Sequence, residues 1–192
     1  MRLGQHWFDV ALLSAFEQDR ADGRRKDVNI EEFLLSVERF AVEGQPEADA
    51  LRQDDALQES ALADFRMNFV ESTAWILLDC RGSLHVPEAN TAVLVLLGAH
   101  HASWQLPGTG TFAWQTIIDW KVSEVSGGIE LRIGLLAGGD VVVRAVRGEY
   151  FVGDVPGGDD APPDFTTATH AQVRAGMAAW SSEFSPRGAS FR

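Results

Sequence analysis

The clearest pattern in the chain is an alternation of apolar and polar positions between residues 112 and 152. From 112 to 125 the even positions are mainly apolar, and a period of two with one apolar face is typical of a half-buried strand. A second alternating run covers 129–135 and an apolar run covers 141–146, with glycine-containing turn signals at 126–128 and 138–140. The pattern therefore predicts an antiparallel meander of three strands.

Within the first of these strands the alternation predicts two opposite faces. The residues expected on the buried face are Phe112, Trp114, Ile118, Trp120 and Val122. The residues expected on the polar face are Gln115, Asp119 and Lys121.

Helical periodicity dominates the first part of the chain. Apolar residues between 6 and 21 form one broad helical face, and a charged loop follows at 22–27. Asn29 with Glu32 three residues later has the spacing of a capping box, so a second helix is expected to carry its apolar stripe from 30 to 41. Gly44 is then a suitable residue just beyond its C-terminal end.

A third helix is predicted from Pro46, a residue well suited to a first helical turn. Its first half, 47–59, is polar, whereas Leu62, Phe65 and Phe69 share one face of the second half. These three segments together indicate a helical N-terminal part, 1–72.

Strands are expected from about residue 73. The apolar stretch 74–80 is followed by a turn and a short strand at 84–86, and the continuous apolar run 92–97 predicts a strand buried on both faces. After the meander, 156–163 is a linker rich in Pro, Gly and Asp. Thr169 with Gln172 predicts a capped helix, and 185–192 is expected to be a frayed tail.

These elements predict an α+β fold. It would combine N-terminal helices (1–72), a curved antiparallel sheet or partly open barrel of about six or seven strands (73–155), and a linker with a C-terminal helix packed on the sheet (156–192). Strands followed by one amphipathic helix is also the element order of pleckstrin-homology-like barrels, an analogy of order that no motif in this chain supports. An open sheet with helices on one face is the alternative.

The net charge of the chain limits the classes of partner that we expect it to bind. There are 28 acidic and 16 basic residues, for a formal net charge of -12. Nucleic-acid binders need a cationic surface to neutralise phosphates, so we expect no nucleic-acid partner and no anionic membrane surface. A protein partner is expected to be basic where the two meet. The acidic residues of the polar stretch proposed for such a contact are Asp54, Asp55 and Glu59, with a plain solvated face as the alternative.

Cysteine use and hydropathy favour a cytoplasmic protein. Cys80 is the single cysteine, which excludes an intrachain disulfide and a cysteine-based zinc cluster. We see no secretory signal, and no apolar run approaches the roughly 20 residues that cross a bilayer. Cys80 itself is expected to be a small core residue.

Motifs of catalysis or metal binding are not evident. His100 and His101 are adjacent at the end of the buried strand and so point to opposite faces, which disfavours one ion bound by both. His85 could join one of them from a neighbouring strand. We therefore predict no metal, no cofactor and no catalytic residues. Asp119, close to Trp114 and Trp120, is either an acid–base candidate or, more simply, a solvated partner of Lys121.

Two functional hypotheses follow. The first is a non-enzymatic cytoplasmic binding or regulatory protein that uses acidic helices or a sheet edge, and an inhibitor or immunity-type protein is one version of it. The second is a small-molecule binder or enzyme with a pocket in the curved sheet near Trp104, His101 and Asp119. Trp104 is the best ligand-binding candidate, because it lies outside the alternation that assigns Trp114 and Trp120 to the core.

Overall fold

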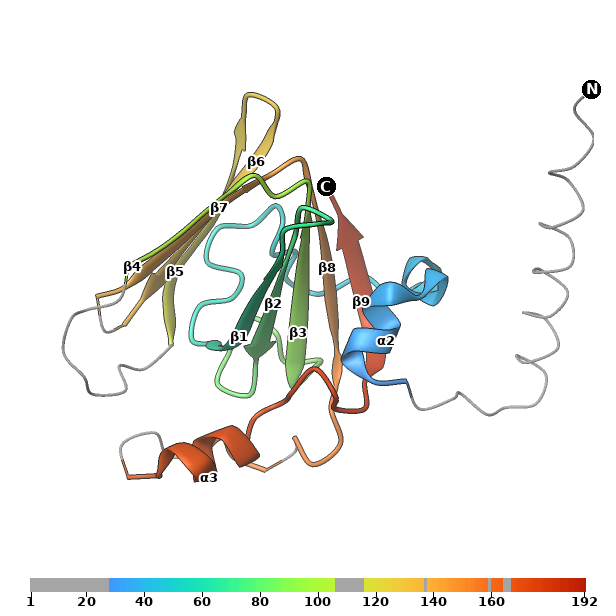
Figure 1. Ribbon diagram of the computed structural model, residues 1–192. Coiled ribbons are helices and arrows are strands. Elements are labelled where there is room, and N and C mark those ends of the chain that lie inside the picture. Colours follow the sequence, from blue (N-terminus) through green and yellow to red (C-terminus); the bar gives the residue numbers. More distant parts are fainter. Residues whose placement is uncertain (1–27, 106–115, 137, 159, 164–166) are drawn as a thin grey trace, which may run out of the picture.

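The computed structural model consists mainly of two antiparallel sheets (Figure 1). It describes residues 28–105, 116–136, 138–158, 160–163 and 167–192. The five-stranded sheet has the order β1 (Ala61–Asn68), β2 (Thr73–Asp79), β3 (Thr91–Leu97), β8 (Arg147–Asp154) and β9 (Ser185–Phe191). The four-stranded sheet has the order β4 (His101–Gln105), β7 (Asp140–Ala145), β6 (Gly128–Leu135) and β5 (Ile117–Val125).

The two sheets are joined where β3 bends into β4 and β7 bends into β8. At this corner the Val146 N–H donates to the Leu97 carbonyl at 2.9 Å, and the His100 N–H donates to the Arg144 carbonyl at 3.0 Å. Gly98 makes the bend with a φ of 66°, a left-handed conformation that favours glycine. A side chain at Gly98 would also collide with Val146, because an added Cβ would lie 2.6 Å from its Cγ2.

The predicted meander is confirmed by β5, β6 and β7, which pair antiparallel in sequence order. Its predicted faces need one correction, because Ile118 is 46% exposed whereas Ile117 is fully buried. The register shifts between Ile117 and Asp119, and this β-bulge places one extra residue on the outside. Trp120 is buried as expected, and Asp119 and Lys121 are exposed, whereas Phe112, Trp114 and Gln115 lie outside the described residues.

Two apolar cores lie on opposite faces of the five-stranded sheet. One fills the space between the sheets and includes Ile76, Leu94 and Trp120. The other lies on the outer face and includes Val93 and Phe151. Because β3 contributes to both cores, the prediction from its continuous apolar run is confirmed.

The predicted second helix is shorter than its stripe suggested. It comprises α2 (Ile30–Leu35), followed by a 3-10 helix, η1 (Val37–Ala41). Asn29 caps α2 as expected, since its side chain accepts a hydrogen bond from the Glu32 N–H at 2.8 Å. The predicted helix over 6–21 lies outside the described residues.

The predicted third helix is wrong. Residues 47–60, here called the strap, form turns without a helix, and Leu51 and Leu57 are fully buried in the core between the sheets. The apolar positions from Leu62 to Phe69 belong largely to β1, where the register shifts between Leu62 and Asp64. This bulge separates the inward residues Leu62 and Phe65 by three positions, which imitates the spacing of a helix.

The end of the chain also differs from expectation. Thr169 and Gln172 do form a capping box, but the helix that they open, α3 (His170–Ala175), is short. The expected tail is β9, which pairs with β8 and buries Ala189. The α+β prediction is therefore wrong, because the described chain is mostly β and forms two antiparallel sheets. It also ends on a strand, whereas the pleckstrin-homology-like order ends on a helix.

Candidate functional site

A cleft of about 540 Å³ lies between β1 and β4. Both are edge strands, since β1 pairs along its length only with β2, and β4 only with β7, among the described residues. Its lining residues are Phe65, Met67, Phe69, Ser72, Ala99, His100, His101, Ala102, Ser103, Trp104 and Val141. The walls are thus mainly apolar, with histidines at one end.

Trp104 is the large aromatic residue that β4 contributes to the cleft. The register aligns it with Val141 and Ile133, whose side chains are buried in the core between the sheets. Trp104 itself remains 37% exposed, and its ring meets Phe65 edge-on with a centroid distance of 5.9 Å. The Phe65–Trp104 pair therefore bridges the two sheets between edge strands that, among the described residues, do not pair with each other.

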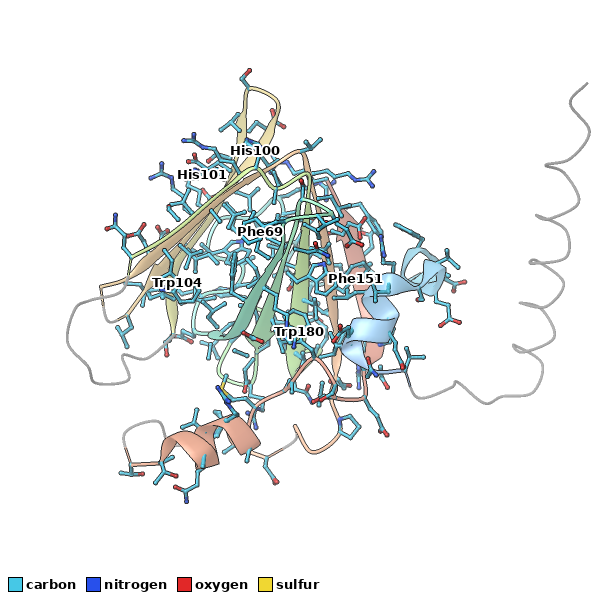
Figure 2. The ribbon with its side chains drawn as sticks, viewed as in Figure 1. Phe69, His100, His101, Trp104, Phe151 and Trp180 are labelled. Atoms are coloured by element: carbon cyan, nitrogen blue, oxygen red, sulfur yellow. The ribbon has the colours of Figure 1, made fainter. Side chains whose placement is uncertain are left out.

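The two histidines lie near the corner where the sheets meet, as the labels in Figure 2 show. The Nδ1 atom of His100 lies 3.1 Å from the Gly98 carbonyl oxygen. His101 pairs with Arg144 of β7, and its side chain is on the opposite face of β4 from that of Trp104. In the part of the chain that the structure describes, no group of three or more His, Cys, Asp or Glu side chains is arranged to hold a metal ion.

Asp119 is not brought to the cleft. It lies on β5, at the other edge of the four-stranded sheet from β4, and its side chain is exposed. Its neighbour Lys121 forms an ion pair with Asp54, with a separation of 3.8 Å between Nζ and Oδ2. Of the three proposed ligand-binding residues, Trp104 and His101 both belong to the lining of the cleft, on opposite faces of β4, whereas Asp119 lies elsewhere.

The proposed acidic partner site lies on the strap. Asp54, Asp55 and Glu59 are all exposed, but they are not on a helix. Asp55 is tied to β5, because its N–H donates to the Trp120 carbonyl at 2.8 Å and its Oδ1 accepts from the Trp120 N–H at 3.3 Å. Glu59 donates its N–H to the Ile117 carbonyl at 2.9 Å. Asp55 and Glu59 therefore anchor the strap along β5 through their backbone, and Asp55 also through its side chain.

An exposed apolar turn at the upper end of the cleft was missed in the sequence. Phe69 is 81% exposed and Val70 is 95% exposed, and both lie in the turn that joins β1 to β2. Large apolar side chains in a tight turn are an unusual combination, and this is the signal that the sequence offered. The Phe69 side chain extends the apolar surface of Phe65 and Met67 beyond the end of β1.

Two titratable side chains, Cys80 and Tyr150, are buried in the core and do not line the cleft. Burial raises the pKa of the Cys80 thiol from 9.0 to about 12, and the Ser60 hydroxyl lies 3.7 Å from its sulfur. Burial also raises the pKa of Tyr150 well above 10.0. Both side chains are fully buried, so the structure keeps them protonated and away from the cleft opening.

On the outer face of the four-stranded sheet, Glu130 is held by two arginines. Hydrogen bonds from Arg132, at 2.8 Å, and Arg144, at 2.6 Å, lower the pKa of the Glu130 carboxyl. Its charge is thus already neutralised, and the three residues form a cross-strand network on β6 and β7.

Comparison with protein families, with curated proteins and with solved structures found no match to this chain. No helix among the described residues has the length and apolar character needed to span a membrane.

Proposed function

We propose that this chain is a non-enzymatic binding protein, and that the cleft between β1 and β4 receives an apolar or aromatic side chain from an extended segment of a protein partner. The observation that carries the proposal is the partly exposed Phe65–Trp104 pair, which lies between two edge strands. Exposed aromatic residues at a concave site are the usual anchors of binding surfaces.

The shape and lining of the cleft favour this kind of ligand. A volume of about 540 Å³ is within the range of sites that enclose a bulky side chain together with its flanking backbone. Phe65, Met67 and Trp104 offer aromatic and thioether contacts, which adapt well to another aromatic ring. The polar groups on the wall are too few to favour a highly charged small molecule.

The edge strands favour an extended peptide. An edge strand presents unpaired backbone N–H and C=O groups, and peptides often bind by adding a strand to such an edge. In the described part of the chain, β4 has no strand beside it on the side away from β7. A peptide paired with β4 would place alternate side chains toward Trp104.

A basic partner is consistent with the formal net charge of -12, which would speed association through long-range attraction. The strap residues Asp54 and Asp55 contribute to this field, but both already have partners within the chain, Lys121 for Asp54 and the Trp120 N–H for Asp55. We therefore propose the cleft as the specific contact and the acidic strap as a source of attraction. The single cysteine agrees with action in the cytoplasm.

The proposal is tested by selecting peptides from a random display library against the full-length protein and measuring their affinity by calorimetry. We expect the selected peptides to share an aromatic residue with basic neighbours. Trp104→Ala should weaken binding by roughly tenfold or more, since it removes a buried aromatic anchor.

Leu84→Ala is the matched control, because Leu84 is an apolar residue that is 80% exposed and does not line the cleft. It should leave the affinity unchanged. Peptides that bind wild type and Trp104→Ala equally well would refute the cleft as the site. Selection of peptides without an aromatic residue would refute the proposed ligand class.

A further inference from the structure

A second exposed apolar surface lies on the opposite side of the five-stranded sheet from the cleft. Its members are contributed by α2, η1 and β9, and we call it the α2–β9 patch. They are Leu35, Val37, Phe40 and Phe191, with exposed fractions of 61%, 67%, 55% and 41%. Several large apolar side chains exposed together indicate a surface that another segment covers.

The patch is held in place by contacts beneath it. Phe40 and Phe191 have ring centroids 6.1 Å apart, and Phe191 meets Phe151 of the outer core at 5.9 Å. Arg39 lies over the Phe40 ring at 4.5 Å, and its Nε is 3.1 Å from Oε2 of the buried Glu149. Its apolar side chains are thus presented by an ordered part of the fold and not by a loose terminus.

The described chain begins beside this patch. Val28 accepts a hydrogen bond from the Phe184 N–H at 3.0 Å, and Ile30 donates to the Ser182 carbonyl at 3.0 Å. These bonds fix the start of α2 against the segment before β9, and Figure 1 shows α2 beside β9. Six helical residues span about 9 Å, so the first described residues lie within a short distance of Leu35.

The sequence of that preceding segment complements the patch. Its predicted helix over 6–21 carries a broad apolar face that includes Trp7, Phe8, Leu12, Leu13 and Phe16. As a helix these 16 residues would be about 24 Å long, and the loop 22–27 can reach about 20 Å when extended. The segment is therefore long enough to turn back along α2 and cover the patch.

Charge also favours this placement. The loop 22–27 is only weakly basic overall, because Asp22 and Asp27 flank the consecutive bases Arg24, Arg25 and Lys26. Glu32 and Glu38 are exposed on α2 and η1. Opposite charges on either side of the turn would hold the returning segment close to the patch.

We propose that residues 6–21 pack their apolar face on the α2–β9 patch of the same chain. This internal docking covers Leu35, Val37 and Phe40 and leaves the cleft between β1 and β4 open on the other side of the sheet. The inference is independent of the function proposed for the cleft.

The test uses a paramagnetic label on the full-length, ¹⁵N-labelled protein. Ala41→Cys places the label at the end of η1, beside the patch but outside the covered residues, and Val70→Cys is the control on the β1–β2 turn, since both positions are exposed. The native Cys80 is fully buried and its raised pKa keeps it protonated, so the reagent will modify the introduced cysteine. Wild type treated in the same way should remain unlabelled.

With the label at position 41, the amide signals of 6–21 and the indole signal of Trp7 should lose most of their intensity. With the label at position 70 they should keep it. The proposal would be overturned if the signals of 6–21 lost intensity only with the label at position 70, or with the label at neither position. Loss that appears only between chains, in a mixture of ¹⁵N-labelled and spin-labelled molecules, would assign the patch to a second copy and also overturn it.

A second measurement does not depend on labelling. The double variant Leu35→Ser and Val37→Ser should speed tryptic cleavage within 20–26, because the docked segment would open more often. Val70→Ser should be cleaved at the wild-type rate. Equal rates in all three proteins would contradict internal docking.

Discussion

At the scale of single residues, burial and hydrogen bonding decide which aromatic residues stabilise the fold and which remain free to bind. Trp120 is fully buried, and its Nε1–H donates to the Ala50 carbonyl at 2.7 Å, so it joins β5 to the strap. Trp180 donates its Nε1–H to Oδ2 of Asp64 at 2.6 Å and packs in the outer core. Trp104 keeps more than a third of its surface exposed.

Replacing Trp120 should show its part in the core. Trp120→Ala removes a large buried side chain and a hydrogen bond, so it should lower the free energy of unfolding by about 3–5 kcal/mol. Ile118→Ala, at the bulged and half-exposed position, should cost about 1 kcal/mol or less. Chemical denaturation measures both variants, and a larger loss from Ile118→Ala would contradict the register of β5.

The buried thiol predicts a pH dependence. Because the pKa of Cys80 is about 12 in the fold and near 9.0 when unfolded, the folded state holds its proton more strongly. Its contribution to stability is complete below pH 9 and is lost as pH rises from 9 toward 12. The stability difference between wild type and Cys80→Ala should therefore fall by about 2 kcal/mol between pH 8 and pH 10.5.

Denaturation at several pH values measures this difference, and comparison with Cys80→Ala cancels the loss that Tyr150 causes in both proteins. A difference that stays constant across this range would mean that the thiol ionises in the folded state as easily as in the unfolded chain.

At the scale of elements, the sequence predicted those strands whose alternation is regular. The meander and the doubly buried β3 were predictable because each position repeats its face without interruption. Bulges concealed β1 and part of β5, since one extra residue shifts the apolar period. The caps of α2 and α3 were also predictable, because they depend on side chains only three residues apart.

The last strand was not predictable from its own residues. β9 contains Pro186 and Gly188, both uncommon within strands, and its pairing depends on β8 and on the segment at 44–46. Ala189 donates its N–H to the Gly44 carbonyl at 2.9 Å, so this edge is partly covered by a segment distant in sequence. Such long-range contacts leave no local pattern.

Gly188→Ala tests this strand. An added Cβ would lie 2.9 Å from backbone atoms of Gln45 and Pro46, which have little freedom to move. We expect a loss of about 1–3 kcal/mol in unfolding free energy. Ser185→Ala, at an exposed position of the same strand, is the control and should change stability little. Equal, small effects of both substitutions would indicate the frayed tail that the sequence suggested.

At the scale of the whole molecule, the fold separates two surfaces on either side of the five-stranded sheet. In Figure 2 Trp104 lies on the side of the four-stranded sheet, and Phe151 lies on the side of α2. The sequence indicated Trp104 as a binding residue because it lies outside the alternation that assigns Trp114 and Trp120 to the core, but it predicted no strand that carries both His101 and Trp104. The sequence did not predict that β1 forms the wall of the cleft facing β4, because the spacing of Leu62, Phe65 and Phe69 predicts a helix there.

The central claim is that the cleft between β1 and β4 is the binding site, and chemical-shift mapping on ¹⁵N-labelled protein tests it most directly. During titration with a selected peptide, the Trp104 indole signal and the amide signals of 65–69 and 101–104 should shift together. The indole signals of Trp120 and Trp180 should stay in place, because both rings are buried in the cores. Shifts confined to the strap at 47–60, with Trp104 unchanged, would contradict the account.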